Sequence, residues 1–210
     1  MTELSTRSSP VQRGPDGPYI QIPGQDLRLT NWKESDMEAA VELNNHPDIG
    51  KWACFRPYPY KPEDYDYRLN LISAHNSSAE LFLSDTAPPL SALEKESELP
   101  LSAVRNSAGR LVGSCSIGPS QKEQGSWELA YDLHPSLQGK GAGKAMVAAL
   151  LDLAKWLRIK RVVAFCEPVN LASAGLLKKS GFTYVGEKLQ KFPEEKGGME
   201  KVIHGYEKIL

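Results

Sequence analysis

The stretch LHPSLQGKGAGKAM, residues 133–146, places three glycines within five positions, directly before a long run of apolar residues with helical spacing. Glycine loses more backbone freedom on folding than any other residue, so this cluster needs a structural reason. The residues before it, SWELAYDL, alternate apolar and polar as a strand does, and KAMVAALLDLAKWLRIK has the period of a helix. The glycines therefore belong to a strand-to-helix turn.

Such a turn has a chemical use. The free N–H groups at the start of a helix point outward and carry partial positive charge, and glycines allow a phosphate to approach them. Two nucleotide motifs fail on spacing: a P-loop has glycine where Gln138 stands and Ser or Thr where Ala145 stands, and the dinucleotide fingerprint G-x-G-x-x-G does not match glycines at 139, 141 and 143. On spacing alone, a turn without any ligand remains the alternative.

The rest of the chain is organised as one unit. Its 210 residues suit a single domain with a full-sized core. Residues 1–24, rich in Ser, Pro, Gly and Gln, predict a flexible N-terminal arm, and residues 25–210 predict one α/β domain of alternating strand and helix patterns. Residues 84–99, SDTAPPLSALEKESEL, break every pattern and predict an exposed insertion.

Composition excludes several classes of partner. A net charge of -1 gives no bulk attraction to nucleic acid or to an anionic membrane. No apolar run reaches membrane-spanning length, and the N-terminus lacks the apolar core of a signal peptide. Three distant cysteines without a C-x-x-C pair are typical of reduced thiols in a cytoplasmic protein. Four scattered histidines lack zinc-ligand spacing, so we expect no metal site.

The glycine turn also resembles a known motif. The hexapeptide QGKGAG, residues 138–143, is similar to the Q/R-x-x-G-x-G/A loop that binds the pyrophosphate of acetyl-CoA in the GNAT superfamily of N-acetyltransferases. WELAYDLHPSLQGKGAGKAM resembles the strand, loop and helix of its RimJ/RimL-type branch, and RVVAFCEPVNLASAGLLKKSGF resembles the next strand and helix. LRLTNWKESDMEAAVELNNHP, RPYPYKPED and RLVGSCSIG are similar to the N-terminal portion and the central hairpin, so the resemblance extends over most of the chain.

This resemblance implies a fold and a donor. The fold is a single α/β (α+β) domain with a mixed, mostly antiparallel sheet and helices on both faces. Two central strands, ending near Leu133 and Glu167, splay apart and admit acetyl-CoA, the acetyl donor. The residues expected to bind this cofactor are Leu133, Gln138, Gly139, Lys140, Gly141, Ala142, Gly143, Lys144, Asn170 and Ser173.

The resemblance implies catalytic residues as well. Glu128, a carboxylate in an otherwise apolar strand, aligns with a glutamate common in this branch and is the expected general base; an ordinary solvated strand residue is the alternative. Leu177 stands where many members carry a tyrosine that protonates the leaving thiolate. Ser173 is the replacement candidate, although a helix-start serine bonded to local backbone explains it slightly better. Without a Cys–His pair, and with Cys166 read as packing, direct attack by the amine is expected.

The acceptor side is predicted only in outline. The loop WACFRPYPY, residues 52–60, is expected to face the acceptor through Trp52, Phe55, Arg56 and Tyr58, with aromatic packing as the alternative. The acceptor is a primary amine, either a protein or peptide N-terminus or a small molecule, and the protein is a monomer or homodimer. Two other functions stay open: a non-catalytic acyl-CoA-binding module, favoured by the missing tyrosine, and a protein-interaction domain on the same fold.

Overall fold

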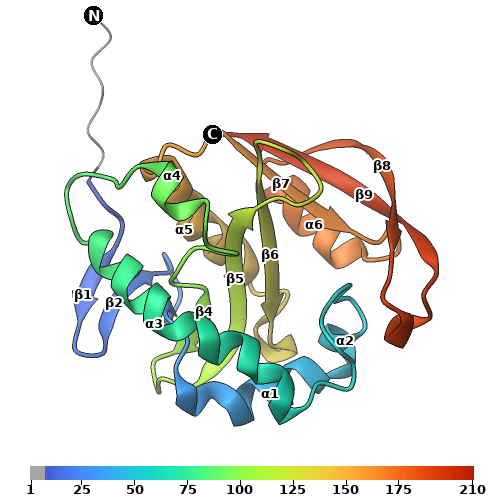
Figure 1. Ribbon diagram of the computed structural model, residues 1–210, viewed down its shortest axis with the longest axis horizontal. Coiled ribbons are helices and arrows are strands. Elements are labelled where there is room, and N and C mark those ends of the chain that lie inside the picture. The colour runs from blue at the N-terminus through green and yellow to red at the C-terminus, as the bar shows by residue number, and fades with distance from the viewer. Residues whose placement is uncertain (1–7) are drawn as a thin grey trace, which may run out of the picture.

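The computed structural model describes residues 8–210, and its centre is one mixed sheet (Figure 1). The strands run in the order β1-β2-β3-β4-β5-β6-β7-β9-β8. All neighbours are antiparallel except β6 and β7, which are parallel, so the predicted mixed, mostly antiparallel sheet is confirmed. The strands are β1 (Gln12–Gly14), β2 (Gly17–Gln21), β3 (Leu27–Thr30), β4 (Ala103–Asn106), β5 (Leu111–Pro119), β6 (Trp127–Leu133), β7 (Arg161–Cys166), β8 (Thr183–Lys191) and β9 (Glu200–Ile209).

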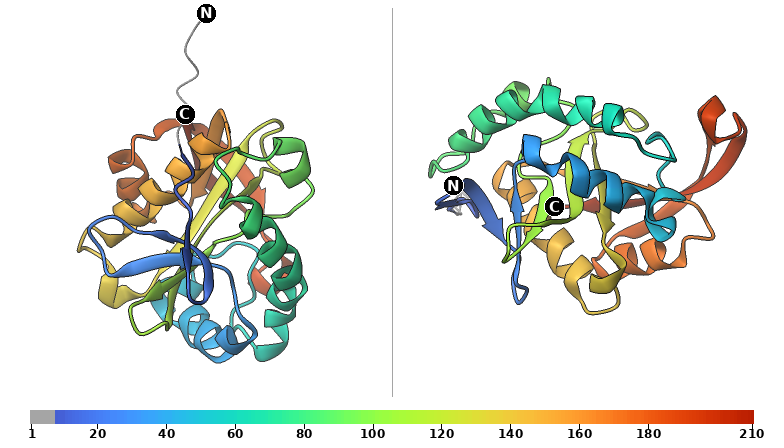
Figure 2. Two further views of the ribbon diagram at one scale, coloured as in Figure 1. Left: turned by 90° about the vertical axis from the view of Figure 1, so that its left-hand side faces the viewer. Right: turned by 90° about the horizontal axis from the view of Figure 1, so that it is seen from below.

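Helices cover both faces of this sheet, as predicted. Figure 2 shows α1 and α3 on one face, and α5 and α6 on the other. The α-helices are α1 (Met37–Asn45), α2 (Pro47–Gly50), α3 (Asp66–Leu81), α4 (Leu90–Leu93), α5 (Ala142–Trp156) and α6 (Leu171–Lys179). Short 3-10 turns are η1 (Glu34–Asp36), η2 (Pro62–Tyr65), η3 (Pro135–Leu137) and η4 (Glu194–Lys196).

The main core lies between α5 and the middle of the sheet. Met146, Leu150 and Leu153 of α5 are fully buried in the same cluster as Ile117 of β5 and Leu129 of β6. Burying one such side chain contributes roughly 1.5–3 kcal/mol, so this helix is held firmly against the sheet. The packing therefore fixes the direction in which the first turn of α5 points.

The two central strands part after a short contact. β6 and β7 pair only at Trp127 with Val162 and at Glu128 with Val163. Beyond these pairs, β6 continues along β5 as far as Leu133, and β7 continues along β9 as far as Cys166. A fork therefore opens between β6 and β7, which confirms the predicted splay.

The N-terminal arm is corrected by the structure. Residues 12–21 form a hairpin, β1–β2, around the two-residue turn Pro15-Asp16, and this hairpin extends the sheet edge. Ile20 and Ile22 are buried in the main core. The prediction of a flexible arm over residues 1–24 is thus wrong for residues 8–24, because Pro and Gly on both sides of the turn concealed a short strand; residues 1–7 lie outside the described residues.

The predicted insertion at residues 84–99 is also more than an exposed loop. It contains the short helix α4, and Leu93 and Leu99 are buried in the main core. The Leu99 N–H donates to the Ile117 carbonyl at 2.7 Å, and a Cβ on Gly118 would lie only 2.1 Å from the Ser97 carbonyl oxygen. The segment is therefore fastened onto β5. Its two anchoring leucines have no regular spacing, so the sequence pattern did not reveal them.

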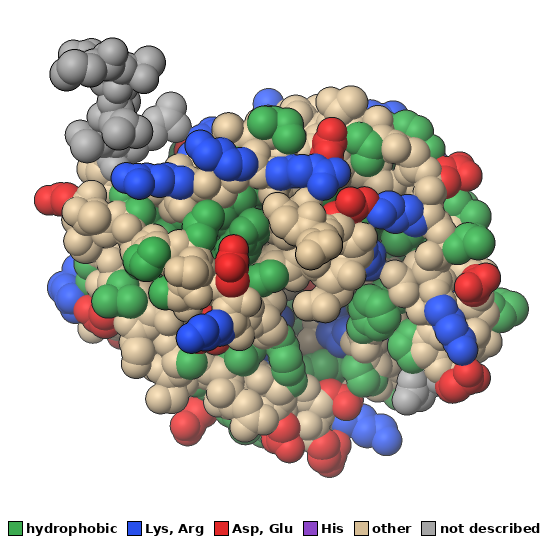
Figure 3. Space-filling model, turned by 45° about the horizontal axis from the view of Figure 1, so that its top comes forward, with side chains coloured by type: hydrophobic (Ala, Val, Ile, Leu, Met, Phe, Trp, Pro, Cys, Tyr) green, Lys and Arg blue, Asp and Glu red, His purple; other side chains and the backbone are tan. Residues whose placement is uncertain are grey.

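The described surface carries charges of both signs. Figure 3 shows Lys and Arg side chains interspersed with Asp and Glu on the face that it draws. Within residues 8–210, no helix has both the length and the apolar composition needed to cross a membrane. The same residues contain no cluster of three or more His, Cys, Asp or Glu placed to hold a metal ion.

Candidate active site

A cavity of about 440 Å³ lies beside the end of β6, where this strand no longer pairs with β7. Its walls come from the end of β6, the glycine turn, the start of α5, the N-terminal part of α6 and the residues around α2. The structure thus brings together segments that are distant in the sequence. The sequence-predicted residues that line it are Trp52, Leu133, Gln138, Gly139, Gly141, Gly143, Lys144, Asn170 and Ser173.

The glycine turn has the backbone that its composition requires. Gly139 has a φ of +72° and Gly141 a φ of +83°, the left-handed region that side chains disfavour. Gly141 is the N-cap of α5, so the N–H groups of the following turn lack partners within the helix. Gly143 and Lys144 belong to that turn and line the cavity. The positive end of α5 therefore faces the cavity.

The side chains of three turn residues contact the protein itself. The Gln138 side chain donates from Nε2 to the Leu133 carbonyl at 2.8 Å, and so it closes the turn upon the end of β6. Lys140 points away, because its Nζ donates to the Ser136 carbonyl. Ala142 is buried beneath the turn. Neither Lys140 nor Ala142 lines the cavity with its side chain, and the contribution predicted for them is that of their backbone N–H groups.

The start of α6 forms the opposite wall. Asn170 caps this helix, with its Oδ1 accepting from the Ser173 N–H at 3.1 Å. The Ser173 hydroxyl lies 2.8 Å from the Tyr131 hydroxyl, and both residues line the cavity. Burial raises the pKa of the Tyr131 phenol, which therefore stays protonated at neutral pH.

Tyr131 was missed by sequence reasoning. The alternation of β6 assigns it to the same face as Trp127 and Leu129, which are buried in the main core. Near the end of β6, however, the core face opens onto the cavity. The available signal was the position of Tyr131, two residues before the strand ends.

Two other residues near this wall have no exposed reactive group. Leu177, which stands at the family's tyrosine position, is fully buried in the main core. Cys166 ends β7, and burial raises the pKa of its thiol. A protonated thiol is a weak nucleophile, so Cys166 does not resemble an acyl carrier.

Glu128 lies at the base of the fork, at the last position where β6 and β7 pair. Its Oε1 is 2.6 Å from Lys122 Nζ, and its Oε2 accepts from the Ser120 hydroxyl at 3.2 Å. The Glu128 side chain is 25% exposed. It does not line the 440 Å³ cavity itself, although it belongs to the same strand as Tyr131 and Leu133.

The loop between α2 and η2 has one residue in the cavity wall and a second that pairs with a residue of that wall. Trp52 lines the cavity directly. Arg56 forms an ion pair with Asp132, a cavity-lining residue of β6, with 2.7 Å between Nη1 and Oδ2. The Arg56 Nε and Nη2 atoms are buried without a hydrogen-bond partner among the described residues. Arg56 therefore has unused donors close to the cavity wall.

The other two aromatic residues predicted in this loop, Phe55 and Tyr58, have different contacts. Phe55 is 61% exposed, and its ring centroid lies 5.6 Å from Lys122 Nζ, beside Glu128. Tyr58 packs on Gly50 so closely that a Cβ there would lie 2.3 Å from the ring. The structure thus brings Phe55 to the Glu128 side of the fork, whereas Tyr58 serves packing.

The tip of the β8–β9 hairpin reaches the same loop. Lys196 of η4 donates from Nζ to the Ala53 carbonyl. Burial lowers the pKa of the Lys196 ammonium, and the neighbouring Arg56 acts in the same direction. The hairpin tip and the loop therefore form a continuous wall beside the fork.

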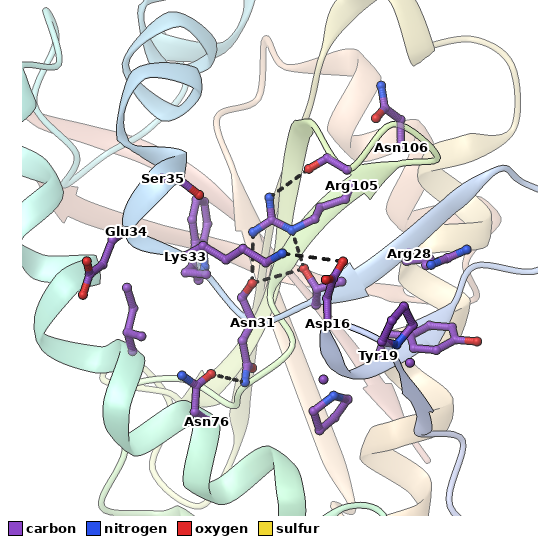
Figure 4. A pocket seen from close by; sticks show the side chains of 18 of the residues that line it. Asp16, Tyr19, Arg28, Asn31, Lys33, Glu34, Ser35, Asn76, Arg105 and Asn106 are labelled. Carbon is purple, nitrogen blue, oxygen red and sulfur yellow. Dashed lines mark hydrogen bonds and ion pairs between the residues drawn. The ribbon is translucent and has the colours of Figure 1, made fainter.

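A second, larger cavity of about 640 Å³ lies between the β1–β2 turn, η1 and α3 (Figure 4). The Arg105 guanidinium is at its floor, where it donates to the Asp36 carboxylate, to Thr30 Oγ1 and to the carbonyls of Asn31 and Gly109. All five of its N–H donors are thus used within the protein. None of the sequence-predicted site residues lines this cavity, and its arginine has a structural role.

Comparison with known proteins assigns the family. Residues 26–183 match the family model described as the acetyltransferase (GNAT) domain. The chain belongs to the GNAT acetyltransferase family.

The individual relatives share only a low sequence identity with this chain. The chain is 25% identical to the uncharacterized N-acetyltransferase p20 of Bacillus licheniformis, over 81% of this chain and 86% of that protein. It is 30% identical to the L-methionine sulfoximine/L-methionine sulfone acetyltransferase of Pseudomonas aeruginosa, over 42% of this chain and 53% of that protein. A similar solved structure is the ribosomal-protein-S5-alanine acetyltransferase of Vibrio fischeri, with a TM-score of 0.65, 19% identity and coverage of 91% and 96% of the two chains. The spermidine N-acetyltransferase of Vibrio cholerae, solved with CoA and spermine, has a TM-score of 0.63, 16% identity and coverage of 88% and 95%.

Proposed function

We propose that this GNAT protein is an N-acetyltransferase that transfers the acetyl group of acetyl-CoA to a primary amine by direct attack. The observation that carries the proposal is the cavity where the N-terminal turn of α5 meets the end of β6, beyond its last pair with β7, and the start of α6. A volume of about 440 Å³ lies within the range of small-molecule sites. The N-acetyltransferase name of the Bacillus relative and the CoA in the Vibrio cholerae structure support the same reading.

The donor fits the polar groups that the cavity offers. The free N–H groups of the first turn of α5, with Lys144, suit the pyrophosphate. The edges of β6 and β7 beyond Glu128 have N–H and C=O groups that the other strand does not pair, and an amide-bearing arm suits them. Acetyl-CoA supplies the activated acetyl thioester.

Glu128 is the proposed general base. An alkyl amine is mostly protonated near neutral pH and must lose a proton before it attacks a carbonyl. Glu128 already holds an ammonium, that of Lys122, at 2.6 Å, so it is placed to accept a proton from an amine. Backbone N–H groups near residues 130–132 are proposed to polarise the thioester carbonyl.

Tyr131 and Ser173 are proposed to assist the leaving thiolate. Their hydroxyls are 2.8 Å apart in the cavity wall, and they replace the tyrosine that is absent at Leu177. Because the pKa of Tyr131 is raised by burial, its phenol is a poor acid but a persistent hydrogen-bond donor. We therefore assign it stabilisation of the thiolate by a donated hydrogen bond rather than complete proton transfer.

The acceptor is proposed to be a primary amine, either a protein or peptide N-terminus or a small molecule. The named relatives include both kinds, a ribosomal-protein alanine acetyltransferase and amino-acid and polyamine acetyltransferases. A screen of N-terminal peptides and small amines with acetyl-CoA, read by thiol release, tests the activity. Absence of turnover on every amine would favour the non-catalytic acyl-CoA-binding alternative.

The Glu128→Gln variant tests the base. We expect it to bind acetyl-CoA normally and to acetylate the amine found in the screen about a hundredfold more slowly near neutral pH. Since the free amine also loses its proton to solvent, the defect should shrink as the pH rises from about 6 to 10. Glu42→Gln, which removes an exposed carboxylate of α1 paired with Arg110, is the control and should act like the parent protein. A rate ratio that stays constant with pH would exclude the base role.

A further inference from the structure

A partly buried cation occupies the base of the fork. Lys122 lies in the loop between β5 and β6, and its Nζ is 2.6 Å from Glu128 Oε1. The same nitrogen lies 4.9 Å from the centroid of the Phe165 ring and 5.6 Å from that of Phe55. The Lys122 side chain is only 19% exposed, which is unusual because lysine generally keeps its ammonium in water.

The groups around this cation form a site rather than a single ion pair. Glu128 comes from β6, Phe165 from β7, and Phe55 from the loop after α2, so three separate segments converge. A carboxylate together with aromatic faces is a chemistry that recognises an ammonium group, since charge and ring quadrupole both attract it. Three elements thus provide an ammonium site, and a side chain of the same protein fills it.

The location matches what the proposed reaction needs. Glu128 stands at the last β6–β7 pair, and Phe165 lies two residues beyond Val163, on the part of β7 that has left β6. An amine held there is next to the proposed base, at the point where the fork between β6 and β7 begins. We therefore propose, on the basis of the N-acetyltransferase function above, that Glu128, Phe55 and Phe165 bind the ammonium of the acceptor, and that Lys122 occupies this site as an internal competitor in the free enzyme.

The neighbouring cations make Lys122 the side chain that moves. Arg56 is paired with Asp132, and Lys188 with Glu123. Lys122 contacts no carboxylate other than Glu128 among the described ion pairs. Its long flexible stem can carry Nζ from the site into solvent, where hydration replaces the lost contacts. One carboxylate cannot fully neutralise two ammonium groups in this partly buried place, so the acceptor must displace Lys122.

The site also defines the class of acceptor. Both rings contact the cation and present apolar surface beside it, so a primary ammonium on an apolar or aromatic stem satisfies all three groups. Moving Lys122 out of the site costs free energy, and this cost lowers the affinity of every acceptor by the same factor. Amines that make only weak contacts with Glu128, Phe55 and Phe165 therefore do not displace Lys122.

The test measures binding without chemistry. Phenethylammonium is titrated calorimetrically into the full-length protein saturated with CoA, which has no acetyl group to transfer. We expect Lys122→Ala to bind this probe about tenfold more tightly than the parent, equivalent to about 1.4 kcal/mol. Lys122→Ala combined with Glu128→Gln should lose that gain, because the carboxylate half of the site is then absent.

Lys188→Ala is the matched control. It removes the same charge at 5.8 Å from the Phe165 ring, but its partner is Glu123 rather than Glu128. Affinity in this variant should stay within about twofold of the parent. Equal gains in both lysine variants would mean a general charge effect and would overturn the proposal.

Two further outcomes would overturn it. One is an affinity of Lys122→Ala that is equal to or below that of the parent, or no binding of the probe to any variant, in proteins whose thermal melting shows them folded. The other is stoichiometric acetylation of Lys122 itself by acetyl-CoA, seen by mass spectrometry, which would make Lys122 the substrate. Because the titration uses CoA alone, its result is independent of the turnover screen that tests the acetyltransferase function.

Discussion

At position 141 the backbone has a φ of +83°, and no heavy atom lies within 4 Å of where a Cβ would stand. The glycine is therefore required by conformation and by the open cavity in front of it, not by crowding within the protein. Gly118, in contrast, is required because of crowding, since the Ser97 carbonyl leaves no room for a Cβ. The sequence predicted the first case from the strand-to-helix context, whereas the second depends on a segment that only tertiary packing brings near.

Gly141→Val tests the role of this conformation at the proposed cofactor site. We expect CoA affinity to fall at least tenfold, because a branched side chain would project into the phosphate region and strain the left-handed backbone by about 1–3 kcal/mol. Gly24→Val is the control: Gly24 has a φ of +67° in the β2–β3 turn and also has an open Cβ position. Calorimetric titration with CoA and thermal melting of both variants measure the outcome. Similar CoA affinities in folded variants would show that the turn does not hold phosphate.

His75 predicts a pH dependence of stability. It is 1% exposed on α3, and burial lowers its pKa, with Arg68 acting in the same direction and Glu98 and Glu96 opposing. The unfolded chain, with a histidine pKa of about 6.5, therefore binds a proton at a higher pH than the folded protein does. Stability from the neutral imidazole is complete above about pH 6.5 and is lost as the pH falls below it.

His75→Leu should make the unfolding free energy fall less between pH 7.5 and 5.0 than it does in the parent protein. Urea denaturation at the two pH values measures the difference. An identical loss in both proteins would assign the acid sensitivity to other groups.

At the scale of elements, prediction succeeded where one segment has a regular period of its own. β6, the glycine turn and α5 follow each other in sequence, and each has a clear local pattern. The β1–β2 hairpin is rich in Pro and Gly, and α4 has only four residues and follows two prolines, so burial against distant segments decides their structure. The same cause concealed the role of Tyr131, whose partner Ser173 comes from another element.

Leu93→Ala tests whether residues 84–99 are structural. Leu93 is 2% exposed in the main core, and removing a buried leucine side chain generally costs about 2–5 kcal/mol. Leu81→Ala, an exposed leucine at the end of α3, is the control and should cost far less. Chemical denaturation of both variants provides the measurement. Equal, small losses would return the segment to the exposed insertion that the sequence predicted.

At the scale of the molecule, the sheet type, the helices on both faces and the fork all agree with the family resemblance in the sequence. The sequence could not supply the contacts that cross between segments. The Arg105–Asp36 pair joins residues 69 positions apart, and Arg56 reaches Asp132 across 76 positions. Such contacts follow from how elements are stacked, and no local spacing records them. The strand-to-helix context of the glycine turn was therefore predictable from the sequence, whereas the contacts of Arg56 required the structure.

The short junction of β6 and β7 divides the sheet mechanically. β1 to β6 form one plate and β7, β9 and β8 form another, and the two share a seam of only two residue pairs. A molecule that hydrogen-bonds to the free edges of both β6 and β7 would extend their junction as an added strand does. The sheet would therefore become stiffer as more of the protein binds this molecule. Binding and release of the ligand would then stiffen and loosen the β6–β7 junction in turn. The junction between β6 and β7, which has only two residue pairs, would then be the one that such a ligand completes.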